Sequence, residues 1–245
     1  DATKLLPRPI SICEINKEDS RLRVVYRVTG ENTGTEEFSK LKTGDAIPII
    51  GPLGNGFPFE AAEGKKVFLM GGGIGVPPIL ELAKQMKCDK KQIVELDWDE
   101  DSSLEAGFKV YCLPARHFSG RGLSSNQSLW ASFLLQAPSQ NIYIGGDGGY
   151  DTHYAEIGER FPNIDLAILE NGQYNEEWKL IHMMPEQMSQ AAKDLNAKKI
   201  LTVHHSKYAL ARHPWDESLQ NAENMRNHDS LNVLIPEIGE IVKLE

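Results

Sequence analysis

The chain has 245 residues, of which 40% are hydrophobic and 25% are charged, and its formal net charge at pH 7 is -9. This composition is typical of a globular protein with one large domain or two small ones. The acidic balance disfavours nucleic acids and anionic membranes as partners, and no apolar run approaches the roughly 20 residues of a membrane span. Three widely spaced cysteines exclude a disulfide framework and an iron–sulfur cluster. We therefore expect a cytoplasmic protein that acts on a small-molecule substrate.

The N-terminal part of the chain has the pattern of short strands separated by turns. Residues 6–15 and 22–28 carry the β-branched and aromatic side chains that are typical of strands, and glycine-rich turns follow them. This spacing predicts a small β-barrel-like segment. Residues 65–70 (KKVFLM) then predict a buried strand. After the turn GGGIG, residues 76–86 predict a helix with one apolar face.

The turn between this strand and helix has the pattern of a phosphate-binding loop. Its glycines would let the backbone approach a pyrophosphate closely, and the first N–H groups of the helix would face the anion. Arg8 offers a guanidinium group for phosphate and Ser11 a hydroxyl group. Gly34 and Thr35 offer a backbone N–H group and a hydroxyl group in a turn.

Residues 5–87 closely resemble the electron-transfer subunit of dihydroorotate dehydrogenase, a ferredoxin-reductase-like flavoprotein. The resemblance rests on the segments RPISI, YRVTGENTGTEEFSKLKTGD, GPLGNGFP and VFLMGGGIGVPPILELAKQ. It implies that Arg8 and the Gly34–Thr35 turn hold the FAD pyrophosphate and that Ser11 lies near the isoalloxazine ring. The glycines that would face a nicotinamide dinucleotide are Gly71, Gly72, Gly73 and Gly75. One strand and one helix cannot form a complete dinucleotide crevice, so binding of FAD stays open and binding of NAD is not expected.

The second part of the chain, residues 88–245, predicts an α/β layer. Strands are predicted at residues 108–115, 130–136, 141–144, 165–169 and 199–203, a helix at 185–195 and a closing hairpin at 231–244. Three candidate ligands, His117, Asp147 and His204, follow strands closely. Side chains at one edge of a sheet converge, and two imidazoles with a carboxylate form a normal zinc or iron set. Taken singly, each also has a structural explanation: a capped turn, an Asx turn and a core histidine.

Residues 92–245 resemble the C-terminal half of the metallo-β-lactamase superfamily, which has an αββα sandwich fold. The nearest branch is similar to N-acyl-phosphatidylethanolamine phospholipase D and the L-ascorbate-6-phosphate lactonases, in the segments LPARHFSGRGL, NIYIGGDGGYD and KKILTVHH. The resemblance implies a pair of metal ions, of which His117 binds one, His204 binds the other and Asp147 bridges the two. The ion would be zinc, or manganese or iron, at a partial site. Asp147 would also take part in catalysis, and His182 would lie beside the substrate.

The H-x-H-x-D-H motif that defines this family is absent from the sequence, so the resemblance implies a weakened metal site and impaired hydrolysis. Three hypotheses stay open. We favour a metal-dependent hydrolase that cleaves an ester, lactone or phosphodiester with metal-activated water. The alternatives are a flavin-dependent electron-transfer subunit of pyrimidine biosynthesis and a non-enzymatic chimeric chain. Because half of a sandwich leaves an apolar face open, we also expect a second copy or a partner chain to cover it.

Overall fold

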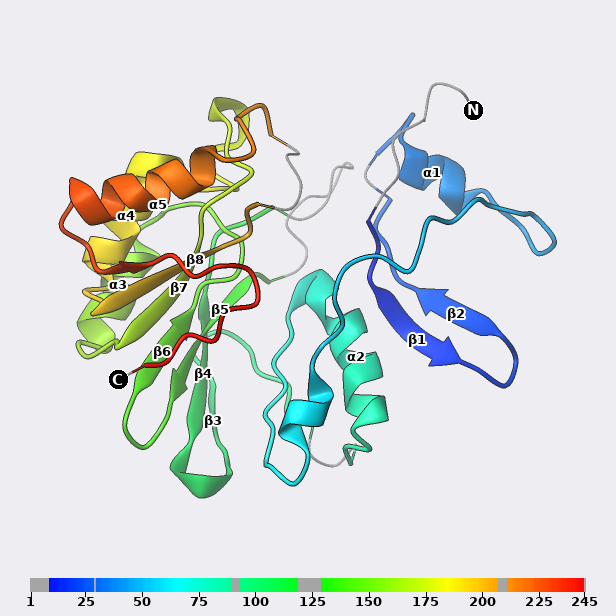
Figure 1. Cartoon of the computed structure of the whole chain (residues 1–245), viewed down its shortest axis with the longest axis horizontal. Helices are drawn as coiled ribbons and strands as arrows, with labels where there is room; N and C mark the ends of the chain where they lie inside the picture. The colour runs from blue at the N-terminus through cyan, green and yellow to red at the C-terminus, as the bar shows by residue number, and fades with distance from the viewer. Residues whose placement is uncertain (1–8, 29, 90–92, 119–128, 207–210, 245) are drawn as a thin grey trace. The chain divides into compact units, whose positions relative to one another are not determined.

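A computed structural model describes residues 9–28, 30–89, 93–118, 129–206 and 211–244 (Figure 1). The chain divides into two compact units, and each is described by itself. The first unit ends at Ile93 and the second begins at Val94. This division lies a few residues after the boundary between residues 87 and 88 that the sequence predicts.

In the first unit, β1 (Ile12–Asn16) and β2 (Arg21–Val24) form a two-stranded antiparallel sheet. The predicted barrel-like segment is wrong, because no other strand joins this pair among the described residues. Residues 65–70, predicted as a buried strand, are not in a strand either. A closed barrel needs a hydrogen-bonded neighbour on both sides of every strand. Without such neighbours the apolar side chains of Ile49 and Ile50 remain exposed.

Two helices complete the described secondary structure of this unit apart from short 3-10 turns. The predicted turn at Gly34 is the start of α1 (Gly34–Ser39), which Thr33 caps by accepting a hydrogen bond from the backbone N–H of Glu36. The helix predicted at residues 76–86 is confirmed as α2 (Val76–Gln85). It contacts β1, where Glu81 accepts a 3.0 Å hydrogen bond from the Ile15 N–H. The 3-10 turns are Phe59–Ala62 and Gly73–Gly75.

The second unit is built on one seven-stranded sheet in the order β3-β4-β5-β6-β7-β8-β9. Its strands are β3 (Asp101–Ser103), β4 (Lys109–Pro114), β5 (Ala131–Gln136), β6 (Asn141–Ile144), β7 (Leu166–Glu170), β8 (Lys199–Val203) and β9 (Val233–Leu234). The pairs from β3 to β6 are antiparallel, and those from β6 to β9 are parallel. The five strands predicted from the sequence are confirmed to within about one residue. The predicted closing hairpin is wrong, because β9 instead joins β8 as a parallel strand.

Three helices pack on one face of this sheet (Figure 1). They are α3 (His153–Arg160), α4 (Pro185–Asp194) and α5 (Glu217–Asn227). The helix predicted at residues 185–195 is confirmed as α4. The core lies between helices and sheet, and its fully buried members include Leu134, Tyr143, Ala167, Leu195 and Ile200. Packing of the three helices on this face of the sheet holds the strands in place, and the strands in turn position the loops at the edge of the sheet.

The opposite face of the sheet is also apolar. Neighbouring strands align Phe133, Ile144, Ile168, Leu201 and Leu234 in one row across it. These side chains are half-buried. Apolar residues on both faces are typical of the parallel strands of an α/β layer.

Candidate metal centre

The carboxyl ends of four strands meet at one edge of the sheet of the second unit. Because β4 is antiparallel to β5 and β5 to β6, β4 runs in the same direction as β6, β7 and β8. His117 follows β4, Asp147 follows β6, Glu170 ends β7 and His204 follows β8 directly. The topology thus brings residues that are far apart in the sequence to one place, as the sequence predicts for three of them.

His117 and Asp147 form the first pair at this edge. The Nε2 atom of His117 lies 3.3 Å from Oδ2 of Asp147, yet the geometry is not that of a hydrogen bond, and this buried nitrogen has no hydrogen-bond partner. Its other ring nitrogen lies 3.2 Å from the carbonyl oxygen of Phe118. Burial alone would lower the pKa of His117, but the nearby Asp147 carboxylate outweighs it and raises that pKa. A buried nitrogen without a partner, next to a carboxylate, fits a site for a divalent cation.

Glycines hold the Asp147 loop close to neighbouring backbone. The N–H of Gly149 donates a 2.7 Å hydrogen bond to the carbonyl oxygen of Arg116. A Cβ atom at Gly149 would lie 2.3 Å from the carbonyl oxygen of Leu180, so only glycine fits there. Burial by itself would raise the pKa of Asp147, but His117 and the other nearby histidines hold it well below its ordinary value. The loop therefore fixes an ionised carboxylate beside the imidazoles.

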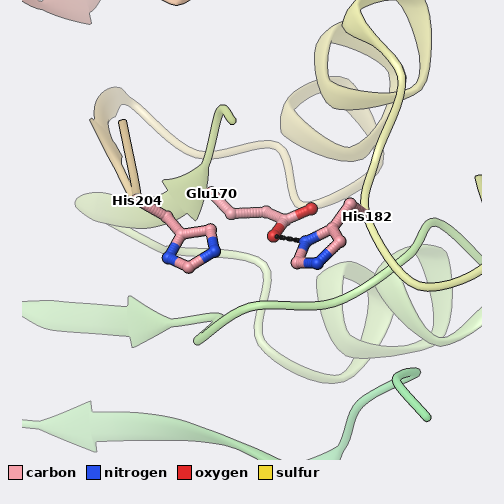
Figure 2. Close-up of side chains that lie close together, drawn as sticks. All are labelled: Glu170, His182 and His204. Carbon is pink, nitrogen blue, oxygen red and sulfur yellow. Dashed lines mark hydrogen bonds and ion pairs between the residues drawn. The ribbon is translucent and has the colours of Figure 1, made fainter. Parts of the chain in front are cut away.

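Glu170 and His182 form a second carboxylate–imidazole pair (Figure 2). Oε2 of Glu170 lies 2.7 Å from Nδ1 of His182, and its Oε1 accepts a 2.6 Å hydrogen bond from the N–H of Met183. Glu170 is 1% exposed, and burial raises its pKa, although His182 opposes the shift. The sequence analysis did not identify Glu170 as a site residue. In the sequence, Glu170 is distinguished only by its position directly after the apolar run LAIL.

His204 joins the two pairs from the end of β8. Its φ angle is 65°, in the left-handed region that most residues other than glycine avoid, although asparagine, aspartate and histidine adopt it more often than the rest. Its ring stacks on that of His182 with centroids 5.5 Å apart, and the rings of His182 and His117 lie 5.4 Å apart. Although the residue is exposed as a whole, the side chains packed around its ring desolvate it and lower the pKa of His204, which favours the neutral form that binds metal ions.

Donor atoms of Glu170, His182 and His204 all lie within 4.8 Å of one another. Figure 2 shows the Glu170 carboxylate between the two imidazole rings. The two imidazoles and one carboxylate of this group are donors that suit zinc or iron. The group shares only His204 with the ligand set that the sequence predicts, whereas His117 and Asp147 contact each other beside it.

Three further histidines, His205, His213 and His153, have structural partners. Both ring nitrogens of His205 are within hydrogen-bond distance of hydroxyl groups, those of Thr202 and Ser206. His213 accepts a 3.0 Å hydrogen bond from the N–H of Gln173. His153 is buried against Tyr154.

The residues predicted to bind FAD belong to the first unit. Ser11 and Thr35 line a shallow pocket of about 290 Å³, to which Tyr26, Arg27 and Ile74 also contribute. Gly34 begins α1 instead of lying in a turn, and Gly73 and Gly75 belong to the 3-10 turn before α2. Gly71 and Gly72 precede that turn. Arg8 lies outside the described residues.

Comparison with known proteins shows the family of the chain. The sequence profile of the beta-lactamase superfamily domain matches residues 75–205, which is more than half of the chain. The chain belongs to the beta-lactamase superfamily. A 59% identity over 95 residues to outer membrane protein RomA of Klebsiella pneumoniae covers 39% of this chain and 72% of that protein.

Two more relatives show how the similarity is divided. An uncharacterized protein of Mycobacterium tuberculosis is 38% identical over 154 residues, which cover 62% of this chain and 41% of that protein. The electron-transfer subunit of dihydroorotate dehydrogenase B (NAD(+)) of Streptococcus mutans is 53% identical over 91 residues, 37% of this chain and 34% of that protein. The chain therefore combines similarity to two families and spans less than half of each of these two relatives.

The solved structure of Igni18, a metallo hydrolase from Ignicoccus hospitalis, superposes with a TM-score of 0.58 at 16% sequence identity. The superposition covers 78% of this chain and 85% of that one, and it supports the beta-lactamase superfamily fold. Among the helices that the structure describes, none is long and apolar enough to cross a membrane.

Proposed function

We propose that the chain is a metal-dependent hydrolase of the beta-lactamase superfamily that cleaves an ester, a lactone or a phosphodiester. The observation that carries this proposal is the buried Nε2 atom of His117, which lacks a hydrogen-bond partner and faces Asp147 at the edge of the sheet. By the family resemblance, His117, Asp147 and His204 would hold the metal ion. A bound divalent ion would polarise the oxygen of the scissile group and acidify a water molecule enough to make it a nucleophile.

The surrounding residues have roles that follow from their contacts. Asp147 is ionised, so Oδ2 can accept a hydrogen bond from water and orient it. His182 is held through Nδ1 by Glu170, and its Nε2 atom is placed to hydrogen-bond a leaving group. The H-x-H-x-D-H motif of the family is missing from the sequence, so we expect slow turnover.

Zinc content and hydrolysis test this function together. Purified protein should bind zinc and should hydrolyse p-nitrophenyl acetate or bis(p-nitrophenyl) phosphate faster than the His117→Ala variant does. The matched control is His205→Ala, which removes a neighbouring histidine with hydroxyl partners and should retain the hydrolytic activity. A protein that binds zinc but turns over neither substrate, or that loses nothing with His117→Ala, would contradict the proposal.

The pocket of the first unit favours a second candidate, a flavin-dependent electron-transfer function. The hydroxyl-bearing residues Ser11 and Thr35 line the same pocket as the aromatic ring of Tyr26, and these are groups suited to a phosphate and to a planar ring system. Protein purified after incubation with FAD should then be yellow, with flavin confirmed by mass spectrometry. Colourless protein would instead support the hydrolase or the non-enzymatic chimera.

A further inference from the structure

We propose that Glu170, His182 and His204 form the tightest cation site of this chain, so that its ion is bound by two imidazoles and a buried carboxylate. The proposal rests on the proposed metal-dependent function and names a different ligand set for it. In the described part of the chain, these three residues are the group of histidine, cysteine and acidic side chains whose donor atoms all lie within 4.8 Å of one another.

The burial of Glu170 is the first argument. A carboxylate that is 1% exposed is costly unless charges or hydrogen bonds compensate it. Glu170 has two N–H partners, the backbone of Met183 and the ring of His182. Only the Met183 N–H is fixed by the backbone. Nδ1 of His182 lies on a side chain, so it can instead bind an ion together with Oε2 of Glu170.

The geometry of the pair is the second argument. Ligand atoms on a tetrahedral zinc ion, with bonds of about 2.0–2.2 Å, lie roughly 3.3 Å apart. The 2.7 Å separation of Oε2 and Nδ1 would therefore open by a few tenths of an ångström as an ion replaced the shared proton. Glu170 and His204 come from the ends of the neighbouring parallel strands β7 and β8, which fix their spacing. His182 lies outside the sheet, on the segment that leads to α4.

The exposure of His204 is the third argument. Glu170 is buried and His182 is half-buried, whereas His204 is exposed. The three protein groups would surround an ion on one side only. On the other side the site opens to solvent, which leaves a coordination position for water. Two histidines, one glutamate and an open position are the pattern of a catalytic zinc site rather than a structural one.

Zinc affinities of four variants test the proposal, measured by competition with a chromophoric chelator on the full chain. Glu170→Gln and His182→Gln should each weaken binding of the first zinc ion by more than about 100-fold, which exceeds the 10- to 100-fold loss typical of a lost supporting hydrogen bond. His117→Gln and Asp147→Asn should weaken it by about tenfold at most, which is the lower end of the 10- to 100-fold loss typical of a residue beside a metal site. His205→Gln is the matched control and should leave the affinity unchanged. Circular dichroism and thermal unfolding check that each variant folds.

The opposite pattern, with binding lost in His117→Gln and Asp147→Asn but retained in Glu170→Gln and His182→Gln, would overturn this ligand set and leave the proposed hydrolase function intact. Equal losses in all four variants would also overturn it. Absence of zinc binding by the wild-type chain would overturn both proposals. If Glu170→Gln does not fold, the cobalt(II) spectrum of the wild-type chain decides, because the proposed site should give ligand-field bands that His182→Gln changes and His117→Gln does not.

Discussion

Oε2 of Glu170 lies 2.7 Å from Nδ1 of His182, and both side chains lie beside the ring of His204. The pair joins the last residue of β7 to a segment twelve residues further on. The edge of the sheet therefore holds two carboxylate–imidazole pairs, this one and Asp147 with His117, with His204 available to either. Separate experiments can test whether zinc binds at this edge, whether the backbone of His204 is strained and whether the Asp147 loop needs its glycines.

Zinc should stabilise the folded chain if it binds at this edge. A ligand that binds only the native state at about 100 times its Kd raises the free energy of unfolding by about 2.7 kcal/mol. We therefore expect a higher Tm in excess zinc, reversed by EDTA, and no such increase for His204→Ala. Differential scanning calorimetry of the second unit's transition measures this. An equal increase in His204→Ala would mean that zinc binds elsewhere.

Replacement of His204 should separate metal binding from backbone strain. Its φ of 65° costs an L-amino acid about 1–2 kcal/mol, whereas glycine adopts this conformation freely. Both His204→Ala and His204→Gly should lose a ligand, but His204→Gly should be the more stable of the two by about 1 kcal/mol in urea denaturation. The same pair at His205, which is not in the left-handed region, should give the opposite order, with the glycine variant less stable. Equal stability of the two His204 variants would contradict strain at this position.

Gly149→Ala should disrupt the Asp147 loop. The new Cβ atom would lie 2.3 Å from the carbonyl oxygen of Leu180, so one of the two segments must move. Overpacking of this kind costs about 1–3 kcal/mol, and displacement of Asp147 should lower activity as well. Gly56→Ala is the control, because no atom lies within 4 Å of the Cβ position there and its φ is not positive. Thermal denaturation and ester hydrolysis of both variants provide the comparison, and a stable, fully active Gly149→Ala chain would contradict close packing at this loop.

The strands of the second unit could be predicted from the sequence because they are short, nearly continuous apolar runs, such as NIYI and LAIL. The common direction of β4, β6 and β8 also brings His117, Asp147 and His204 to one edge. The helix α5 was not predicted, because its sequence ESLQNAENMRN carries few apolar residues and shows little periodicity. Its buried face consists of Ser218, Ala222 and Met225, which become a core face only through their contacts with the sheet.

Two features were predicted wrongly or missed because they depend on contacts between residues far apart in the sequence. A barrel-like segment was predicted in the first unit from local composition, but strand pairing depends on partners that local composition does not specify. Glu170 was missed because an acidic residue at the end of a strand usually faces solvent. It is buried only because residues 182–183 fold back over it and supply two N–H groups.

Tyr150→Phe should lower stability in a way that depends on pH. The Tyr150 hydroxyl donates a 2.6 Å hydrogen bond to Asp194, at the end of α4, and this contact raises the pKa of Tyr150 to about 12. The pKa of this tyrosine is higher in the folded chain than in the unfolded chain, where it is about 10. The hydrogen bond therefore stabilises the fold fully below pH 10, and this stabilisation is lost as the pH rises toward 12. Loss of the hydrogen bond should cost about 1 kcal/mol between pH 7 and 9, and the difference between wild type and variant should shrink above pH 10. Urea denaturation at several pH values measures this, with Tyr26→Phe in the first unit as control. A difference that stays constant up to pH 12 would show that the hydroxyl does not bond to Asp194 in solution.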